Sequence, residues 1–164
     1  MLELVSPDAA LHAAWLESHR EWGSGQHEDG FGVGPADDVE TPQGFATWVD
    51  ELLSRPAHVW WIVNDHRVVG GITLRAFTDD SVQRLGHVGY GVQPSARGRG
   101  IAAWALGQVV EVAWTTGMQQ VLLVCSDSNV ASIRTIERCG GVREEAVQDA
   151  HGRERRYWID RKTP

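Results

Sequence analysis

Apolar and polar positions follow strand or helix periodicity along most of the first third of the chain. Leu2–Ser6 alternates apolar and polar residues and predicts a short strand. A helix is expected from Pro7 to about Trp22, because apolar residues recur there at helical spacing. Thr41-Pro42 offers an N-cap followed by a first-turn proline, and the apolar stripe after it predicts a second helix: Phe45, Trp48, Val49, Leu52 and Leu53.

The remaining pattern predicts strands alternating with helices. The expected elements are, in order, strands His58–Val63, Arg67–Phe77 and His87–Val92, helix Gly98–Gly117, strand Gln120–Cys125, helix Val130–Cys139, and a last hairpin of Val142–Asp149 and Arg153–Asp160. The strand–helix–strand unit at 87–125 requires a parallel strand pair with a right-handed crossover, whereas the hairpins add antiparallel strands. The fold class is therefore α/β (α+β), with one mixed sheet.

Residues 23–40, called here the acceptor segment, show neither periodicity. They are rich in glycine and acidic residues and are longer than most connections in compact domains. Such a segment is typical of a functional loop or a lid.

Size and composition limit the classes of function. The chain has 164 residues, enough for a single domain spanning 1–164, and its eight tryptophans are expected to pack the core. A formal charge of -7 argues against a nucleic-acid partner and suits a cationic small molecule. Two cysteines make neither a disulfide framework nor a metal site, so a reducing, cytoplasmic location is expected. Neither a signal peptide nor a membrane span is predicted.

The sharpest local signal is the stretch HVGYGVQPSARGRGIA at 87–102, which passes from a strand through a glycine-rich turn into a helix. We call residues 97–100 of this turn the glycine loop. Small residues there let the backbone approach a ligand, and the first amides of a helix form an anion site. Arg97 and Arg99 add positive charge, so a pyrophosphate or phosphate ester is the expected ligand. The stretch has neither the phosphate-loop motif of nucleotide hydrolases nor the dinucleotide-binding GxGxxG.

The sequence Arg97-Gly98-Arg99-Gly100-Ile101-Ala102 resembles the Q/R-x-x-G-x-G/A motif of the GCN5-related N-acetyltransferases, the GNAT superfamily. Downstream, Asn129-Val130-Ala131-Ser132 and Glu137-Arg138-Cys139-Gly140 resemble the N-x-x-A/S…E-K/R-x-G segment of the same family. The order of elements also matches, so the resemblance covers nearly the whole chain. It implies the GNAT fold, a single mixed and mostly antiparallel twisted sheet with a parallel, splayed strand pair and about four helices. Within the superfamily, the chain is similar to uncharacterised bacterial acetyltransferases, and its excess of arginine over lysine is typical of a GC-rich bacterial genome.

The resemblance implies acetyl-CoA as cofactor and a set of residues that hold it. Backbone groups of Tyr90 and Val92 would bind the pantetheine arm and offer an oxyanion donor, and Asn129 and Ser132 would contact the pantetheine or the adenosine. The amides expected to hold the pyrophosphate are those of Arg97, Gly98, Arg99, Gly100, Ile101 and Ala102. No metal ligand is expected.

The proton transfers leave alternatives open. Many relatives have Glu where this chain has His87, and a histidine near neutral pH could act as the base, or it could only pack or cap at a strand start. The tyrosine that serves as acid in relatives corresponds to Ile136. A water, Ser128, Ser132 or direct departure of the thiolate then remains for that step.

Glu28 and Asp29, in the acceptor segment, are candidate substrate-binding residues, because a carboxylate pair attracts an alkylammonium ion. Asp37 and Asp38 belong to the same acidic stretch, and a solvated loop surface is the alternative for each acid. Three functions stay open: acetylation of a small-molecule primary amine, acetylation of a protein N-terminus or lysine, and binding of coenzyme A without catalysis. The last hairpin is compatible with a homodimer, since relatives often pair through that region.

Overall fold

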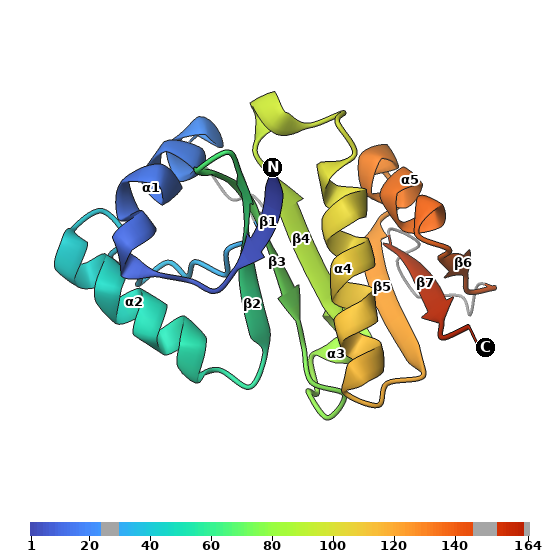
Figure 1. Cartoon of the computed structure of the whole chain (residues 1–164). Coiled ribbons are helices and arrows are strands. Elements are labelled where there is room, and N and C mark those ends of the chain that lie inside the picture. The colour runs from blue at the N-terminus through green and yellow to red at the C-terminus, as the bar shows by residue number, and fades with distance from the viewer. Residues whose placement is uncertain (24–29, 146–153, 163–164) are drawn as a thin grey trace. The chain divides into compact units, whose positions relative to one another are not determined.

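Strands and helices alternate along the chain in the expected order (Figure 1). The computed structural model describes residues 1–23, 30–145 and 154–162. The first elements are β1 (Leu2–Val5), a 3₁₀ turn η1 (Ala9–Leu11), α1 (His12–Glu21), α2 (Pro42–Ser54), β2 (His58–Asn64) and β3 (Arg67–Leu74). They are followed by α3 (Val82–Leu85), β4 (Val88–Val92), η2 (Pro94–Ala96), α4 (Ile101–Thr115), β5 (Gln120–Ser126), α5 (Val130–Arg138), β6 (Val142–Arg143) and β7 (Glu154–Asp160).

The structure divides into two units that the chain enters in turn. The first comprises Met1–Thr73 and Tyr90–Ala102, and the second Leu74–Gly89 and Ala103–Pro164. Because each unit is made of two separate stretches, neither is an independent segment of sequence.

The described strands form two hydrogen-bonded sheets, where the sequence predicts one. Four strands pair in the order β1-β2-β3-β4, and three in the order β5-β7-β6. In the second sheet β7 pairs antiparallel with both neighbours, with Leu123 opposite Tyr157 and Val142 opposite Trp158. Sequence periodicity assigns residues to strands but does not fix which edges pair, so the number of sheets was the weaker part of the prediction.

Side-chain caps define the starts of three helical elements. The Asp8 carboxylate accepts from Ala10 N–H, the Thr41 hydroxyl accepts from Gly44 N–H, and the Asn129 side chain accepts from Ser132 N–H. Each cap supplies an acceptor to a first-turn amide that has none within its own helix. The cap expected at Thr41 is therefore confirmed, and Asn129 is the one of the polar residues 127–129 that caps the helix expected after them.

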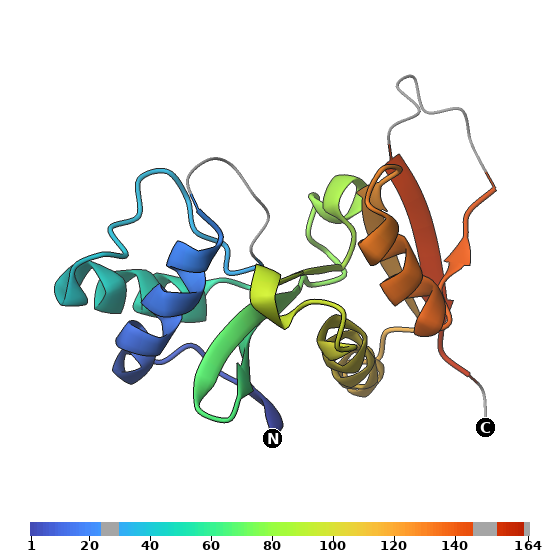
Figure 2. The same ribbon diagram turned by 90° about the horizontal axis from the view of Figure 1, so that it is seen from above.

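An aromatic cluster forms the core of the first unit. Trp15 of α1 lies at its centre, with ring centroids 4.9 Å from Trp48, 5.2 Å from Phe45 and 5.2 Å from Phe31. All four rings are buried, as is Trp61 of β2. Both views show α1 beside α2 (Figures 1 and 2). The rings of Trp15 on α1 and of Phe45 and Trp48 on α2 pack against one another. The expected core role of the tryptophans is borne out for Trp15, Trp48 and Trp61.

The core of the second unit lies between helices and the β5–β7 pair. Val121, Leu122 and Leu123 of β5 are fully buried, as expected for a strand covered on both faces. α4 contributes Ala105, Leu106, Val109 and Ala113, all without exposed surface. α5 lies along β5, visible in both views (Figures 1 and 2).

Some element boundaries differ from the expectation. β3 ends at Leu74, and Phe77, expected in that strand, is exposed. The expected polar loop at 78–86 holds α3, a single turn whose Val82 N–H donates to Asp79 O and whose Val82 side chain is buried. Four residues are too few to show helical periodicity. The strand expected at 142–149 is shorter than predicted, because β6 ends at Arg143 and residues 144–145 are not in a strand; residues 146–149 lie outside the described residues.

Backbone contacts between glycines bring Gly30 of the acceptor segment onto β3 and β4. A Cβ atom placed on Gly30 would lie 2.4 Å from both the Gly71 oxygen and the Gly91 nitrogen. One placed on Gly70 would lie 2.2 Å from the Gly91 oxygen. No side chain fits at these distances, so glycine is required for this close packing.

Gly70→Ala should therefore destabilise the protein by about 1–3 kcal/mol, because the added methyl meets backbone that cannot move aside. Thermal unfolding followed by circular dichroism measures the change. The matched control is Gly107→Ala within α4, where an added Cβ meets nothing within 4 Å. That change should stabilise the helix by up to about 1 kcal/mol, and equal behaviour of the two variants would contradict the packing argument.

Candidate functional site

The glycine loop exposes main-chain amides at the start of α4. Gly98 and Gly100 have φ values of +75° and +78°, which glycine adopts without strain. A Cβ at either position would meet nothing within 4 Å, so the space above both is open. Gly100 directly precedes α4 and has no side chain with which to cap it, unlike the residues that cap η1, α2 and α5.

The backbone N–H groups of this turn are arranged to bind an anion. Arg97 N–H lies 3.3 Å from Pro94 O, but no acceptor for the amides of Gly98 or Gly100 occurs among the described residues. The first amides of α4 likewise have no acceptor within their own helix. Together with the positive end of the helix dipole, these donors form a site that fits a phosphate or diphosphate.

The two arginines of the glycine loop have different surroundings. Arg97 folds back, so that its Nε donates to Val92 O at 2.9 Å and its guanidinium lies over the Trp22 ring, 4.8 Å from the centroid. Arg99 is exposed and has no ion-pair partner within the described part of the chain. Arg99 is therefore the side-chain cation available to an anionic ligand, whereas Arg97 shapes the loop.

β4 lies at one end of its four-stranded sheet, next to β3. Gln93 N–H donates to Val69 O of β3 at 2.8 Å. Because successive residues of a strand direct their backbone groups to opposite sides, those of Tyr90 and Val92 point away from β3. This orientation is the one required to pair with an extended ligand lying along the outer edge of β4.

His87 is buried, with 2% of its surface exposed, and is held by backbone on both sides. The backbone N–H of His87 donates to Leu122 O at 2.7 Å, and the backbone N–H of Leu122 donates to the His87 ring Nδ1 at 2.8 Å. A ring that accepts at Nδ1 carries the proton of its neutral form on Nε2. Nε2 is buried without a partner among the described residues, so it offers a hydrogen-bond donor.

Burial lowers the pKa of His87, and the Arg75 guanidinium lowers it further. The ring is thus neutral at physiological pH, which a base requires, but neither nitrogen presents an unused lone pair. Of the two roles left open by the sequence, this geometry favours packing at the strand start. Leu122 lies 35 residues further along the chain, so no sequence signal could have revealed the bond.

The structure also shows the surroundings of Ile136 and of other side chains that could donate a proton or bind a ligand. Ile136 is buried in the core, so this position supplies no proton donor. Tyr157, one of the two tyrosines of the chain, is buried and donates its hydroxyl to Glu137 Oε1 at 3.2 Å. Asn129 uses its side-chain oxygen to cap α5 through Ser132 N–H at 3.0 Å, which leaves its amide NH₂ group for a ligand. Burial raises the pKa of both Cys125 and Cys139, so neither is an activated thiolate.

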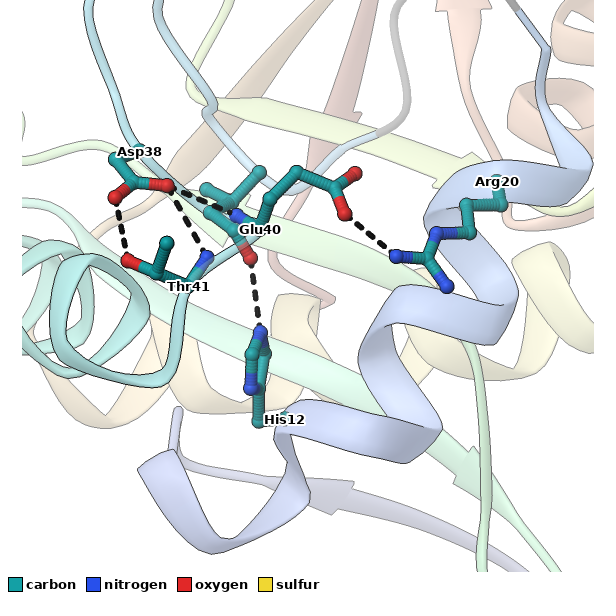
Figure 3. A network of polar contacts seen from close by, with 6 residues as sticks. His12, Arg20, Asp38, Glu40 and Thr41 are labelled. Atoms are coloured by element: carbon teal, nitrogen blue, oxygen red, sulfur yellow. Dashed lines mark hydrogen bonds and ion pairs between the residues drawn. The ribbon is translucent and has the colours of Figure 1, made fainter.

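Two acids of the acceptor segment, Asp37 and Asp38, hold its local structure, and the contacts of Asp38 are drawn in Figure 3. Asp38 accepts from the Thr41 hydroxyl and from the amides of Glu40 and Thr41, and these hydrogen bonds, the hydroxyl first, lower its pKa. Asp37 accepts from Gly34 N–H at 2.6 Å. The carboxylates of Asp37 and Asp38 thus have a structural role, because both accept hydrogen bonds from residues close to them in the sequence.

The same segment is anchored to α1. The Val39 carbonyl is bound to the His12 ring at 2.9 Å, and Glu40 pairs with Arg20 at 2.5 Å (Figure 3). Glu28 and Asp29, the candidate substrate-binding residues, lie outside the described residues. Across the described ranges there is no cluster of His, Cys, Asp or Glu suited to a metal ion, and no helix long and apolar enough to cross a bilayer.

The family is established by the sequence as a whole. The family model described as an acetyltransferase (GNAT) domain matches residues 2–142, and the chain belongs to this family. Its class is that of the acetyl-CoA-dependent acyltransferases. No curated protein matches the chain.

Solved structures with the same fold include several bacterial acetyltransferases. A ribosomal-protein-S5-alanine acetyltransferase from Vibrio fischeri has a TM-score of 0.67 and 18% identity, covering 97% of this chain and 91% of its own. The microcin C7 self-immunity acetyltransferase MccE, in complex with acetyl-CoA and AMP, has a TM-score of 0.67 and 14% identity over 97% and 92%. YncA from Salmonella typhimurium, with its cofactor acetyl-CoA, has a TM-score of 0.63 and 17% identity over 97% and 93%. At these identities the likeness concerns the fold.

The environment of His87 predicts how stability depends on pH. Its folded-state pKa is below the unfolded value of about 6.5, so the unfolded chain binds the proton more readily. The His87 contribution should be fully present above about pH 6.5 and should be lost as pH falls toward the lower folded-state value. Thermal midpoints of wild type and His87→Phe between pH 5 and 8 measure it, and the variant should show the weaker pH dependence.

The exposed turn residue His66 provides the control, since His66→Asn should leave the pH slope of the wild type intact. Nitrogen-15 NMR of the wild type should show a neutral ring protonated at Nε2. A ring protonated at Nδ1, or charged at pH 7, would contradict this assignment and restore the role of base.

Proposed function

We propose that this chain transfers an acetyl group from acetyl-CoA to a primary amine of a small molecule, by direct attack in a ternary complex. The observation that carries the proposal is the glycine loop, where the amides of Gly98 and Gly100 lack acceptors and open space lies above them. This turn belongs to a chain of the acetyltransferase (GNAT) family. In that family the expected anion is the diphosphate of coenzyme A.

The described residues fit coenzyme A on two counts. A diphosphate suits the amides at the start of α4, with the exposed Arg99 side chain as counter-charge. An extended pantetheine arm suits the outer edge of β4, along which the backbone groups of Tyr90 and the Val92 N–H point, since the Val92 carbonyl is bound to Arg97 Nε. Contacts from Asn129 and Ser132 are a further part of the proposal, with the Asn129 NH₂ group as the donor that its capping role leaves over.

When bound, acetyl-CoA supplies the activated thioester. The residues of the chain orient the two substrates and stabilise the charge that forms on the carbonyl oxygen. The amide of Val92 or Tyr90 is the proposed donor to the oxyanion that forms when the amine attacks the carbonyl. Glu28 and Asp29 are the proposed partners of the acceptor ammonium ion. Because the His87 ring accepts from Leu122 N–H, we assign the removal of the ammonium proton to a carboxylate or to water.

The distribution of charge favours a cationic acceptor. The residues of the first unit, 1–73 and 90–102, include twelve Asp and Glu against five Arg, a formal charge of -7. The second unit has ten acidic and ten basic residues, so the first unit carries the whole net charge of the protein. A negative field concentrated around the acceptor segment raises the local concentration of a positively charged amine.

Acetylation of a protein N-terminus or lysine is the alternative. This alternative is supported by the ribosomal-protein-S5-alanine acetyltransferase, which has the same fold and is named for a protein acceptor. MccE, whose structure contains the small molecule AMP beside acetyl-CoA, supports the small-molecule acceptor. A cytoplasmic location also belongs to the proposal, supported by Cys125 and Cys139, which are both free thiols.

Gly100→Leu should weaken the binding of coenzyme A by at least about tenfold, because its side chain would occupy the space of the phosphate. Isothermal titration calorimetry with acetyl-CoA measures the affinity. The matched control is Gly117→Leu, since Gly117 also has a positive φ, +91°, and open space around its Cβ. Both variants place a side chain at a positive φ, so both carry similar backbone strain. A loss of affinity in Gly100→Leu alone would therefore come from the ligand site and not from the strain.

Wild-type protein that takes up no acetyl-CoA at micromolar concentration would refute the cofactor assignment. Equal affinity in Gly100→Leu and Gly117→Leu would refute the placement at the glycine loop.

The acceptor class is tested by release of free thiol from acetyl-CoA over a library of amines. Small cationic amines should be acetylated, with kcat/KM falling several-fold as salt rises from low to physiological concentration, because screening removes the attraction of the acidic unit. Asp29→Asn and Glu28→Gln should raise KM for the amine and leave the affinity for acetyl-CoA unchanged. Glu51→Gln, on the exposed side of α2, is the control. Turnover of basic peptides in preference to every small amine would favour the protein acceptor instead.

A further inference from the structure

The last turn of α1 contacts the segment that leads into the glycine loop. Glu21 Oε1 accepts from Ser95 N–H at 2.5 Å, and Glu21 Oε2 accepts from the Ser95 hydroxyl at 2.9 Å. Both oxygens of one carboxylate are thus bound to one residue of η2, 74 positions further along the chain. All the residues involved belong to the first unit.

The position of Glu21 needs an explanation. It is the last residue of α1, where the helix dipole presents its negative end and disfavours a carboxylate. Ser95 supplies the compensation: Pro94 before it has no N–H, so the Ser95 amide is the first donor of η2 and lacks an acceptor within that turn. The Glu21 carboxylate therefore caps η2 from another element.

Trp22, which follows Glu21, makes the second contact. The Arg97 guanidinium stacks over its ring at 4.8 Å while Arg97 Nε donates to Val92 O at 2.9 Å. A stacked guanidinium with one fixed hydrogen bond has a defined orientation, and that orientation sets the path of the backbone at the start of the glycine loop. Gln93 completes the arrangement, since its side chain donates to the Ser95 hydroxyl at 3.2 Å.

Beyond Arg97 the loop has little else to fix it. Added Cβ atoms on Gly98 and Gly100 would meet nothing, and the side chains from Pro94 to Arg99 are exposed, apart from Ala96. The contacts from Glu21 and Trp22 are therefore the side-chain contacts that hold the entrance of the loop within the described residues. A loop held in its ligand-binding form loses less conformational entropy on binding.

We propose that Glu21 and Trp22 are positioning residues that hold the glycine loop ready for the diphosphate of coenzyme A, an inference that rests on the proposed function. The acceptor segment begins directly after them, at residue 23. The same helix end therefore sets both the start of the acceptor segment and the geometry of the cofactor loop.

Glu21→Ala should raise the dissociation constant of coenzyme A about fivefold, and raise KM for acetyl-CoA similarly, with kcat within about twofold of wild type. Glu21→Gln keeps an acceptor oxygen for Ser95 N–H and should recover most of the affinity. Trp22→Ala should weaken binding, whereas Trp22→Phe, which retains a ring for Arg97, should bind nearly as well as wild type. Titration calorimetry and steady-state kinetics provide the two readouts.

A double-mutant cycle tests the contact itself. Ser95→Ala should weaken binding less than Glu21→Ala, and the double variant should be no worse than Glu21→Ala alone, because both changes remove the same interaction. The matched control is Glu17→Gln, one turn earlier on α1, because the Glu17 carboxylate faces Arg67, at 3.8 Å, and not Ser95.

The outcomes are distinguishable. A wild type that does not bind coenzyme A defeats the proposed function, whatever the variants do. A wild type that binds, with Glu21→Ala and Ser95→Ala of unchanged affinity, overturns this inference alone. It is also overturned if Glu21→Ala lowers kcat and leaves KM intact, or if Glu17→Gln weakens binding equally. Should Glu21→Ala fail to fold, Ser95→Ala and Trp22→Ala give the same comparison.

Discussion

Backbone amides without acceptors at the start of α4 are the constraint on which the site depends. Elsewhere the chain satisfies such donors with side-chain oxygens, as Asp8, Thr41 and Asn129 do. Before α4 it places Gly100, which has no side chain to offer, and Gly98 two residues earlier. Unpaired amides in water cost little, but they gain much when an anion takes the place of water. The arrangement thus needs no ligand to be stable, and it suits a ligand that carries phosphate.

A loop of small residues cannot hold its own shape, so its neighbours hold it. The backbone of Gly70 packs against that of Gly91, and the backbone of Gly71 against that of Gly30, which ties β3, β4 and the acceptor segment together. Glu21 and Trp22 act on the next stretch through Ser95 and Arg97. Each exposed contact is individually weak, and their combination on consecutive residues is what restricts the backbone.

Several polar residues that the sequence offers for chemistry have structural roles in this fold. The His87 ring accepts from the Leu122 amide, and Asp37 and Asp38 close turns of the acceptor segment. In each case a buried or turn-forming backbone or side-chain group needed a partner. Among the described residues, the groups that remain for chemistry are the main-chain donors along β4 and at the start of α4, and the Arg99 side chain. This set matches acyl transfer, in which orientation and oxyanion stabilisation matter more than a single catalytic side chain.

The order of strands and helices, the caps at Thr41 and Asn129 and the glycine loop were all determined by the sequence, because each depends on residues a few positions apart. The family followed from the same local motifs. Only the tertiary structure decided which distant groups meet: the Leu122 amide at His87, the Glu21 carboxylate at Ser95, and the division of the strands into two sheets. Hydrogen bonds between residues 35 or 74 positions apart leave no periodic trace. The roles of His87 and Glu21 could therefore be derived only from coordinates, since the physical cause lies in the partner and not in the residue itself.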